Sequence, residues 1–340
     1  MNTVTEPTTQ KRQLRVLSNS EITTFRRCAR EHHYTYGLRR RPRVISDALR
    51  FGTLIHHALE AWWMVGLGEP DLAQARWNAA VTAIREHGAK SDAFERVRAE
   101  ELMLGYTARW GDDSIPVVAV EAKFTAPLIN PETGAASKTF QLGGKLDVIT
   151  ASGFVEHKTT SHDIEEGSAY WRRVSALDSQ VSTYEVAKRA FGIEGNCLYD
   201  VIRKPALRPL RATPVESRKY TKEGKLYANQ REHDETPEEY RARLRVDISE
   251  QPTKYFARGE VPRLDGDMRE HAVDTWRWAQ LIREAERVNV FPRNPDACIR
   301  YGRECDFFGV CSGSASIDDD TLFRTADTAH EELAEKEIQF

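Results

Sequence analysis

Three observations on the sequence predict an α/β fold, in which strands and helices share one core. Residues 140–160 contain two apolar stretches around the turn Ala151-Ser152-Gly153, a pattern typical of a strand hairpin. Residues 116–126 and 196–202 are apolar runs of strand length. Segments of helical character precede and separate these strands, and a chain of 340 residues can bury a substantial core.

Charge and cysteine content narrow the class of protein. A net charge of −3 gives the chain as a whole no attraction for DNA, so any polyanion must bind to local basic patches. The sequence has neither a run of about 18 apolar residues nor the apolar core of a signal peptide. We therefore expect a cytoplasmic protein with no membrane partner. In a reducing compartment its five cysteines favour thiolate ligands over disulfides.

Charged residues on the predicted hairpin indicate a metal site. Side chains at i and i+2 of a strand share a face, so Glu156 and Lys158 point the same way and His157 points to the opposite face. If the two strands pair, the Asp147 side chain lies beside those of Glu156 and Lys158. Two carboxylates can hold Mg²⁺, and a nearby lysine can assist hydrolysis of a phosphate ester. The alternative is a surface hairpin whose Glu156–Lys158 ion pair is worth about 0–1 kcal/mol.

The chain before the hairpin is predicted to begin with a disordered tail, because residues 1–16 are polar and aperiodic. Ser18 followed by Glu21 forms a capping box, which predicts a helix over residues 19–36 that carries Cys28.

Residues 48–65 predict a strongly apolar, largely buried helix that carries His56 and, one turn later, Glu60. From the residues alone, His56 is either a ligand or a core histidine bonded to backbone carbonyls. Residues 71–87 and 92–110 predict two supporting helices.

Two further positions are candidates for a site. The strand before the hairpin carries Glu121, whose carboxylate needs a partner such as Lys123 or another cation, because burying it alone is costly. After the hairpin, residues 166–191 predict a helix on which Gln180 and Tyr184 share a face. These two residues form either a packing pair or one wall of a site.

The C-terminal part of the chain has a different character. Residues 203–265 form a charged insertion, basic at its start, whose cations either bind phosphates or form a solvated loop. A long helix over residues 266–289 precedes a cysteine cluster, and residues 312–340 form an acidic tail that we expect to be peripheral. The cluster contains Cys298, Cys305 and Cys311.

Together these features resemble the PD-(D/E)XK nuclease superfamily and, within it, the RecB/AddB-type branch whose members carry an iron–sulfur cluster. The central segment departs from the founding motif, since GGKLD lacks its proline and Glu156 stands in place of Asp. Four other segments match in the family's order: SNSEITTFRRC at 18–28, FGTLIH at 51–56, QVSTY at 180–184 and CIRYGRECDFFGVC at 298–311.

The resemblance implies a restriction-endonuclease-like core with a mixed central sheet flanked by helices and with helical additions. It places one nuclease domain over residues 17–311, made of an N-terminal helical part (17–110), a catalytic core (111–202), the insertion, and a C-terminal part (266–311). It also implies a [4Fe–4S] cluster that clasps the N- and C-terminal regions together, although the long gap after the first C-terminal cysteine leaves zinc and free thiols open. The cluster ligands would be Cys28, Cys298, Cys305 and Cys311.

The same resemblance assigns roles in the site. Lys158 would assist the attacking water or the transition state, and Gln180 and Tyr184 would shape the site. Glu121 and Glu60 are second-tier candidates. The metal ligands would be His56, Asp147, Glu156 and the backbone carbonyl of His157.

The implied function is a DNA exonuclease, similar to the CRISPR-associated and phage members of this branch. It would hydrolyse single-stranded DNA with Mg²⁺ or Mn²⁺ in recombination, repair or phage replication. The sequence contains no GxxxxGK[ST] phosphate loop, so a helicase or recombination partner would supply any unwinding. The alternatives are a non-catalytic iron–sulfur DNA-binding protein and an electron-transfer protein.

Overall fold

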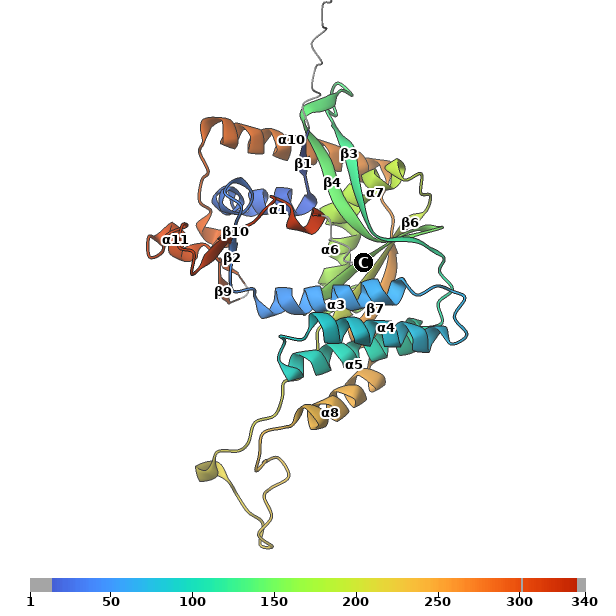
Figure 1. Ribbon diagram of the computed structural model, residues 1–340, viewed down its shortest axis with the longest axis vertical. Helices are drawn as coiled ribbons and strands as arrows, with labels where there is room; N and C mark the ends of the chain where they lie inside the picture. Colours follow the sequence, from blue (N-terminus) through green and yellow to red (C-terminus); the bar gives the residue numbers. More distant parts are fainter. Residues whose placement is uncertain (1–13, 301, 335–340) are drawn as a thin grey trace, which may run out of the picture.

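The computed structural model describes residues 14–300 and 302–334, and a six-stranded mixed sheet lies at its centre (Figure 1). The strands are β1 (Arg15–Leu17), β3 (Val117–Ile129), β4 (Ala136–Thr150), β5 (Gly153–Thr160), β6 (Asn196–Arg203) and β7 (Phe256–Val261). Their order is β1-β4-β5-β6-β7, and β3 also pairs with β4. β1 runs parallel to β4 and β5 runs parallel to β6, whereas the other neighbours are antiparallel.

Helices cover both faces of the sheet, which confirms the expected α/β fold with a mixed sheet flanked by helices. One core lies under α3 (Asp47–Trp63), α4 (Leu72–His87), α5 (Ala93–Trp110) and α8 (Pro237–Glu250). The other core lies under α1 (Asn19–Arg27), α6 (Ala169–Leu177), α7 (Ser179–Ala190) and α10 (Asp265–Val288). Among the described residues, no helix is both long and apolar enough to cross a membrane.

The hairpin of β4 and β5 shows how the sequence divides its side chains between these two cores. Val148 pairs with Val155 and both pack into the first core, whereas Ile149 and Phe154, the next pair, pack into the second. This is the alternation that a strand imposes. The turn requires glycine at position 153, where φ is 150° and a Cβ atom would lie 2.3 Å from the Asn196 carbonyl oxygen.

Two predicted helices are interrupted by residues with extended backbone. The helix expected over residues 19–36 breaks at Cys28 (φ −160°), where α1 ends, and continues as α2 (Ala29–His32) and a π-helical turn (His33–Gly37). The helix expected over residues 166–191 breaks at Asp178. Its carboxylate accepts hydrogen bonds from the N–H groups at the start of α7, so it caps that helix instead of continuing α6.

Both ends of the described chain are more ordered than the sequence predicts. Residues 1–13 of the expected tail lie outside the described residues, but Arg15–Leu17 form β1 because they pair with β4. In the acidic tail, β10 (Phe323–Thr325) pairs with β2 (Arg40–Pro42), and η4 (Glu331–Leu333) follows as a short 3₁₀ turn. This part of the tail is therefore packed against the N-terminal region.

Shorter elements complete the fold. The charged insertion predicted over residues 203–265 is too long, because α8 packs into the first core and β7 belongs to the central sheet. Its first part, between β6 and α8, contains the 3₁₀ turn η2 (Val215–Ser217) and extends away from the helical layer (Figure 1). After α8, α9 (Pro252–Tyr255) leads into β7. The cysteine-rich region contains η3 (Pro295–Ala297), the two-stranded hairpin β8 (Ile299–Arg300) and β9 (Arg303–Glu304), and α11 (Phe308–Ser312).

Candidate active site

A small pocket of about 180 Å³ lies between α3, α7 and the β4–β5 hairpin. The structure brings six of the side chains proposed from sequence to its walls. They come from four separate elements of the chain, so the fold and not sequence proximity assembles them. They are His56, Asp147, Glu156, Lys158, Gln180 and Tyr184.

The two carboxylates reach the pocket from paired strands. Asp147 is half-buried on β4, and its Oδ2 accepts a hydrogen bond of 2.8 Å from the backbone N–H of His157 on β5. Glu156 is buried, and its Oε1 forms an ion pair with Lys158. The other carboxylate oxygen, Oε2, has no hydrogen-bond partner among the described residues. A buried, unsatisfied oxygen of this kind can accept a cation.

Burial and neighbouring charges shift the protonation of these groups. Burial raises the pKa of Glu156 to about 8, with Lys158 acting against this rise and Asp147 adding to it. For Lys158, burial alone would lower the pKa, but Glu156 and Asp147 outweigh it and raise the pKa overall. Burial therefore opposes ionisation of Glu156, whereas a divalent cation would favour the ionised carboxylate.

His56 approaches the carboxylates from α3. Its Nδ1 lies 4.0 Å from Asp147 Oδ1, and burial lowers the pKa of His56 to about 4. The imidazole is therefore neutral near neutral pH, which is the form that binds metals. His157 faces away from the pocket, as the strand alternation predicts, and its ring lies 3.2 Å from Asp200 Oδ2. Only its backbone is near Asp147.

Gln180 and Tyr184 form the wall contributed by α7. They lie one turn apart, and Gln180 Nε2 donates a hydrogen bond of 2.7 Å to the Tyr184 hydroxyl. Burial holds the pKa of Tyr184 well above its ordinary value, so the phenol keeps its proton. An amide and a neutral phenol are therefore available as hydrogen-bond donors at the edge of the pocket.

A comparison with known families shows which superfamily the chain belongs to. The sequence model of the PD-(D/E)XK nuclease superfamily matches residues 16–312, which is most of the chain. The protein belongs to the PD-(D/E)XK nuclease superfamily. Membership implies a metal-dependent nuclease that acts on DNA, and nucleases of this superfamily generally use Mg²⁺ or Mn²⁺. No curated protein sequence matches the chain.

The second-tier candidates of this PD-(D/E)XK protein lie at different distances from the pocket. Glu121 bonds to Lys145, which lines the pocket, and Glu121 has a left-handed backbone (φ 56°), an uncommon conformation for a residue other than glycine. Burial raises its pKa. Glu60 instead lies 3.5 Å from Nδ1 of His57 and does not line the pocket. Glu121 is therefore connected to the site, whereas Glu60 is beside it.

Sequence reasoning did not place in the site eight residues that line the pocket, among them Lys145, Glu332 and Leu333. Lys145 had a local signal, because it lies two positions before Asp147 on the same strand and so shares its face. Glu332 and Leu333 had none, because they belong to the acidic tail and reach the pocket through contacts distant in sequence.

Besides the pairing of β10 with β2, two contacts hold the end of the tail near the pocket. His330 Nε2 lies 3.1 Å from Glu21 Oε2 on α1, and Lys123 on β3 donates a hydrogen bond of 2.8 Å to the Ala334 carbonyl. Burial alone would raise the pKa of Glu21, but hydrogen bonds from His32 and His330 and the charge of Arg15 outweigh it and lower the pKa to about 2. The tail therefore forms part of the wall of the active-site pocket.

The four cysteines expected to bind a cluster line a second, much smaller pocket. All are free, and Cys305 donates its N–H to the Cys298 carbonyl at 2.7 Å. Within residues 14–300 and 302–334, no three His, Cys, Asp or Glu side chains are arranged as a metal-binding group. The iron–sulfur clasp is therefore a proposal, which the convergence of Cys28 with Cys311 supports chemically.

Proposed function

We propose that this protein is an exonuclease that hydrolyses single-stranded DNA in recombination, repair or phage replication. The observation that carries the proposal is the shared pocket of Asp147, Glu156 and Lys158, with both carboxylates on one side of the sheet. Two acids and an amine at one point are the groups that phosphodiester hydrolysis with a divalent metal requires.

The donor set fits Mg²⁺ or Mn²⁺. His56, Asp147, Glu156 and the backbone carbonyl of His157 would hold the ion, and Glu121 would act through Lys145 at the edge of the site. Support comes from the unsatisfied Glu156 Oε2 among the described residues and from the neutral imidazole of His56. Such an ion, when bound, polarises the phosphodiester and activates water.

The other side chains of the pocket orient the substrate and offset charge. The Lys158 ammonium, held by Glu156, lies where negative charge develops on the phosphate oxygens. Gln180 and Tyr184 donate hydrogen bonds to a phosphate oxygen or to the attacking water. The roles of these residues do not require a large movement, because the sheet and α7 already hold them.

The preference for a single strand is inferred from the dimensions of the site. The active-site pocket measures about 180 Å³, and it shares Ser20 and Glu332 with a pocket of about 770 Å³. Another pocket, of about 730 Å³, begins at Thr159, the residue after Lys158. A narrow pocket flanked by wider ones suits single-stranded DNA, because the narrow pocket can hold the phosphate backbone while the unpaired bases turn into the wider pockets. Enclosure by Glu332 and Leu333 favours entry of a free end, hence exonuclease action.

We further propose that the cysteine pocket holds a [4Fe–4S] cluster of the RecB/AddB type, with zinc as the competing occupant. Support comes from the four cysteines lining one pocket, since thiolates are ligands for either occupant. Linking Cys28 to Cys298 closes a loop of about 270 residues, which would stabilise the fold by about 5 kcal/mol in chain-entropy terms. An iron–sulfur cluster absorbs at about 400 nm through thiolate–iron charge transfer, whereas a zinc site is colourless, so the absorption spectrum distinguishes the two.

End-labelled DNA tests the proposed activity. Single strands labelled at the 5′ or 3′ end, and the matching duplexes, are incubated with purified protein and Mn²⁺, Mg²⁺ or EDTA. We expect metal-dependent release of short products from single strands, with the labelled end giving the polarity. Cleavage of circular single strands would contradict exonuclease action. Binding without cleavage under every metal condition would instead establish a non-catalytic DNA-binding protein.

A further inference from the structure

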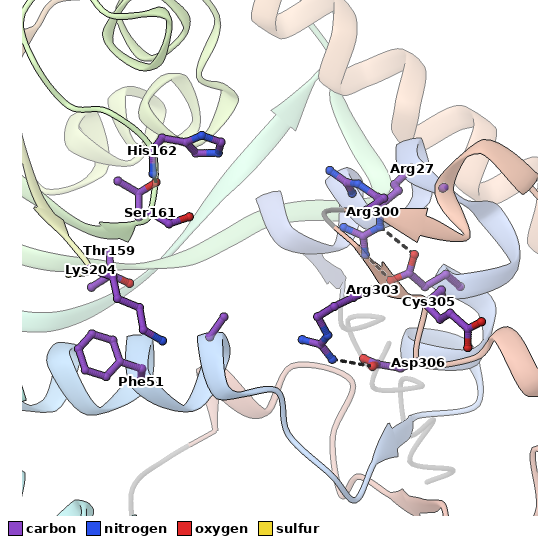
Figure 2. A pocket seen from close by; sticks show the side chains of 15 residues that line it. Arg27, Phe51, Thr159, Ser161, His162, Lys204, Arg300, Arg303, Cys305 and Asp306 are labelled. Carbon is purple, nitrogen blue, oxygen red and sulfur yellow. Dashed lines mark hydrogen bonds and ion pairs between the residues drawn. The ribbon is translucent and has the colours of Figure 1, made fainter. Parts of the chain in front are cut away.

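A pocket of about 730 Å³ lies beside the candidate active site, and the proposed hydrolysis leaves it without a role (Figure 2). It begins where β5 ends, since Thr159 and Thr160 line it. Thr160 follows Glu156 and Lys158 on the same face of the strand, and two strand residues span about 7 Å. A substrate strand that leaves the Lys158 ammonium along β5 would therefore enter this pocket.

The pocket has two walls that face each other across open space (Figure 2). One wall contains Phe51 of α3 with Ser161, His162 and Lys204, which follow β5 and β6. The opposite wall belongs to α1 and to the β8–β9 hairpin, and its cations are Arg27, Arg300 and Arg303.

The cations on the two walls differ in how they are paired. Arg27 Nε donates to Glu31 at 2.8 Å, and Arg303 lies 3.8 Å from Asp306, so carboxylates on their own wall offset both charges. Lys204 makes no ion pair with any residue that the structure describes, and its ammonium lies 4.6 Å from the ring centroid of the buried Phe51. Burial lowers the pKa of Lys204. An anion bound beside Lys204 would stabilise its charged ammonium form, which burial disfavours.

The same wall offers an aromatic surface. The exposed His162 ring is stacked on Tyr170, with ring centroids 6.3 Å apart and planes inclined by 28°. The Tyr170 hydroxyl is in turn hydrogen-bonded to Tyr199 at 3.1 Å, which fixes the underlying ring. Histidine is among the side chains on which unpaired bases stack, and a supported ring loses little freedom on binding.

We propose that this pocket binds the nucleotide next to the scissile phosphate of a single-stranded substrate, with Lys204 against its phosphate and His162 against its base. The assignment rests on the proposed nuclease function and extends it. It supplies a physical reason for the strand preference, because a base must be unpaired to stack on His162.

DNA binding without cleavage tests this proposal. The full chain and its variants are titrated in EDTA against a fluorescein-labelled oligothymidylate, and anisotropy is followed at several salt concentrations. Lys204→Gln should weaken binding and reduce the slope of log Kd against log salt by about 0.7, the value for one lost single-strand phosphate contact. His162→Ala should weaken binding by about tenfold, the cost of one lost stacking contact, and leave the salt slope unchanged.

Matched variants at distant positions provide the controls. Lys138→Gln removes an exposed lysine near the far end of the β3–β4 hairpin, and His233→Ala removes an exposed histidine of the insertion. Both should bind the oligonucleotide like the wild type. Melting temperatures of all four variants show whether any loss of affinity comes from unfolding.

Two outcomes would overturn the assignment. Wild-type affinity and salt slope in both Lys204→Gln and His162→Ala would exclude this pocket as a nucleotide site. An equal loss of affinity in His162→Ala for a blunt-ended linear duplex, which has no unpaired bases, would exclude the stacking role. The test is separate from catalysis, since wild-type protein that cleaves DNA while both variants bind normally contradicts the subsite alone. If both variants bind more weakly as expected but the wild type cleaves no DNA, the result contradicts the proposed nuclease activity and leaves the nucleotide site intact.

Discussion

The active-site pocket and the cysteine pocket are built in opposite ways. Asp147 and Glu156 lie on paired strands of one hairpin, and the register of β4 and β5 fixes their positions. Cys28 and Cys311 come from opposite ends of the chain, Cys28 directly before the four-residue α2 and Cys311 on the five-residue α11. A sheet keeps its side chains in position whether or not a ligand is bound, whereas short elements need a bound metal or cluster to keep their cysteines together. We therefore expect the first pocket to be preformed and the second to need its cluster.

Removing one cluster ligand should have the largest effect. Cys28→Ala is expected to lower the free energy of unfolding by about 5 kcal/mol, because the long loop between the chain ends is no longer closed. Thermal unfolding and iron content of the purified variant measure this. Cys197→Ala is the control, since Cys197 is buried on β6 away from the cluster and its loss should cost about 1 kcal/mol with iron retained. A stable Cys28→Ala protein would remove the distinction between the two pockets.

Removing the amine of the preformed pocket should affect the reaction more than the fold. Lys158→Ala is expected to reduce the rate of Mn²⁺-dependent cleavage by about 10²–10³-fold, because charge developing on the phosphate is no longer offset. Its melting temperature should remain close to that of the wild type. Lys138→Ala, which removes an exposed lysine near the far end of the β3–β4 hairpin, is the control and should cleave at nearly the wild-type rate. Equal rates for wild type and Lys158→Ala would refute the role of the lysine.

The contact between the tail and α1 predicts a pH dependence of stability. Burial alone would lower the pKa of His330, but hydrogen bonds to Glu21 and Glu332 raise it to about 9. A raised histidine pKa stabilises the fold fully below the ordinary pKa of about 6.5, and this contribution is lost as pH rises through about 9. Urea unfolding between about pH 6 and pH 10 should show a loss of up to about 3 kcal/mol.

His330→Asn provides the comparison for that measurement. The variant should be less stable than the wild type near neutral pH and should lose the part of the alkaline decrease that His330 supplies. Parallel stability curves for the two proteins would show that the tail does not depend on this charge.

The smallest effect concerns the turn that sets the register of the active-site hairpin. Gly153→Ala should lower the free energy of unfolding by about 2 kcal/mol, because a Cβ atom would approach the Asn196 carbonyl oxygen at 2.3 Å. Gly66→Ala has no atom within 4 Å of the added methyl group and should leave stability nearly unchanged in urea unfolding. Equal stability of the two variants would mean that the turn does not fix the hairpin.

These differences also explain what the sequence could predict. The positions of Asp147, Glu156 and Lys158 follow from a local rule, the alternation of side chains along a strand, and the apolar helix around His56 follows from another. Such rules need only neighbouring residues. The mixed sheet and its flanking helices were predictable for the same reason, with the family resemblance supplying the topology.

Features that depend on distant contacts could not be predicted locally. The helix break at Cys28 leaves that residue on the cysteine pocket, and no local pattern of the segment around it specifies this. Glu332 reaches the active site only because β10 pairs with β2 and His330 meets Glu21. Asp178 did carry a local signal, because aspartate is a preferred N-cap, and a continuous helical pattern masked it.

Binding of Mn²⁺ shows whether the two carboxylates hold one ion, on which the proposed hydrolysis depends. Calorimetric titration of Mn²⁺ into the wild type and into Asp147→Asn should show one site in the wild type that is lost in the variant. Unchanged Mn²⁺ binding by Asp147→Asn would contradict the claim that Asp147 and Glu156 form a hydrolytic metal centre.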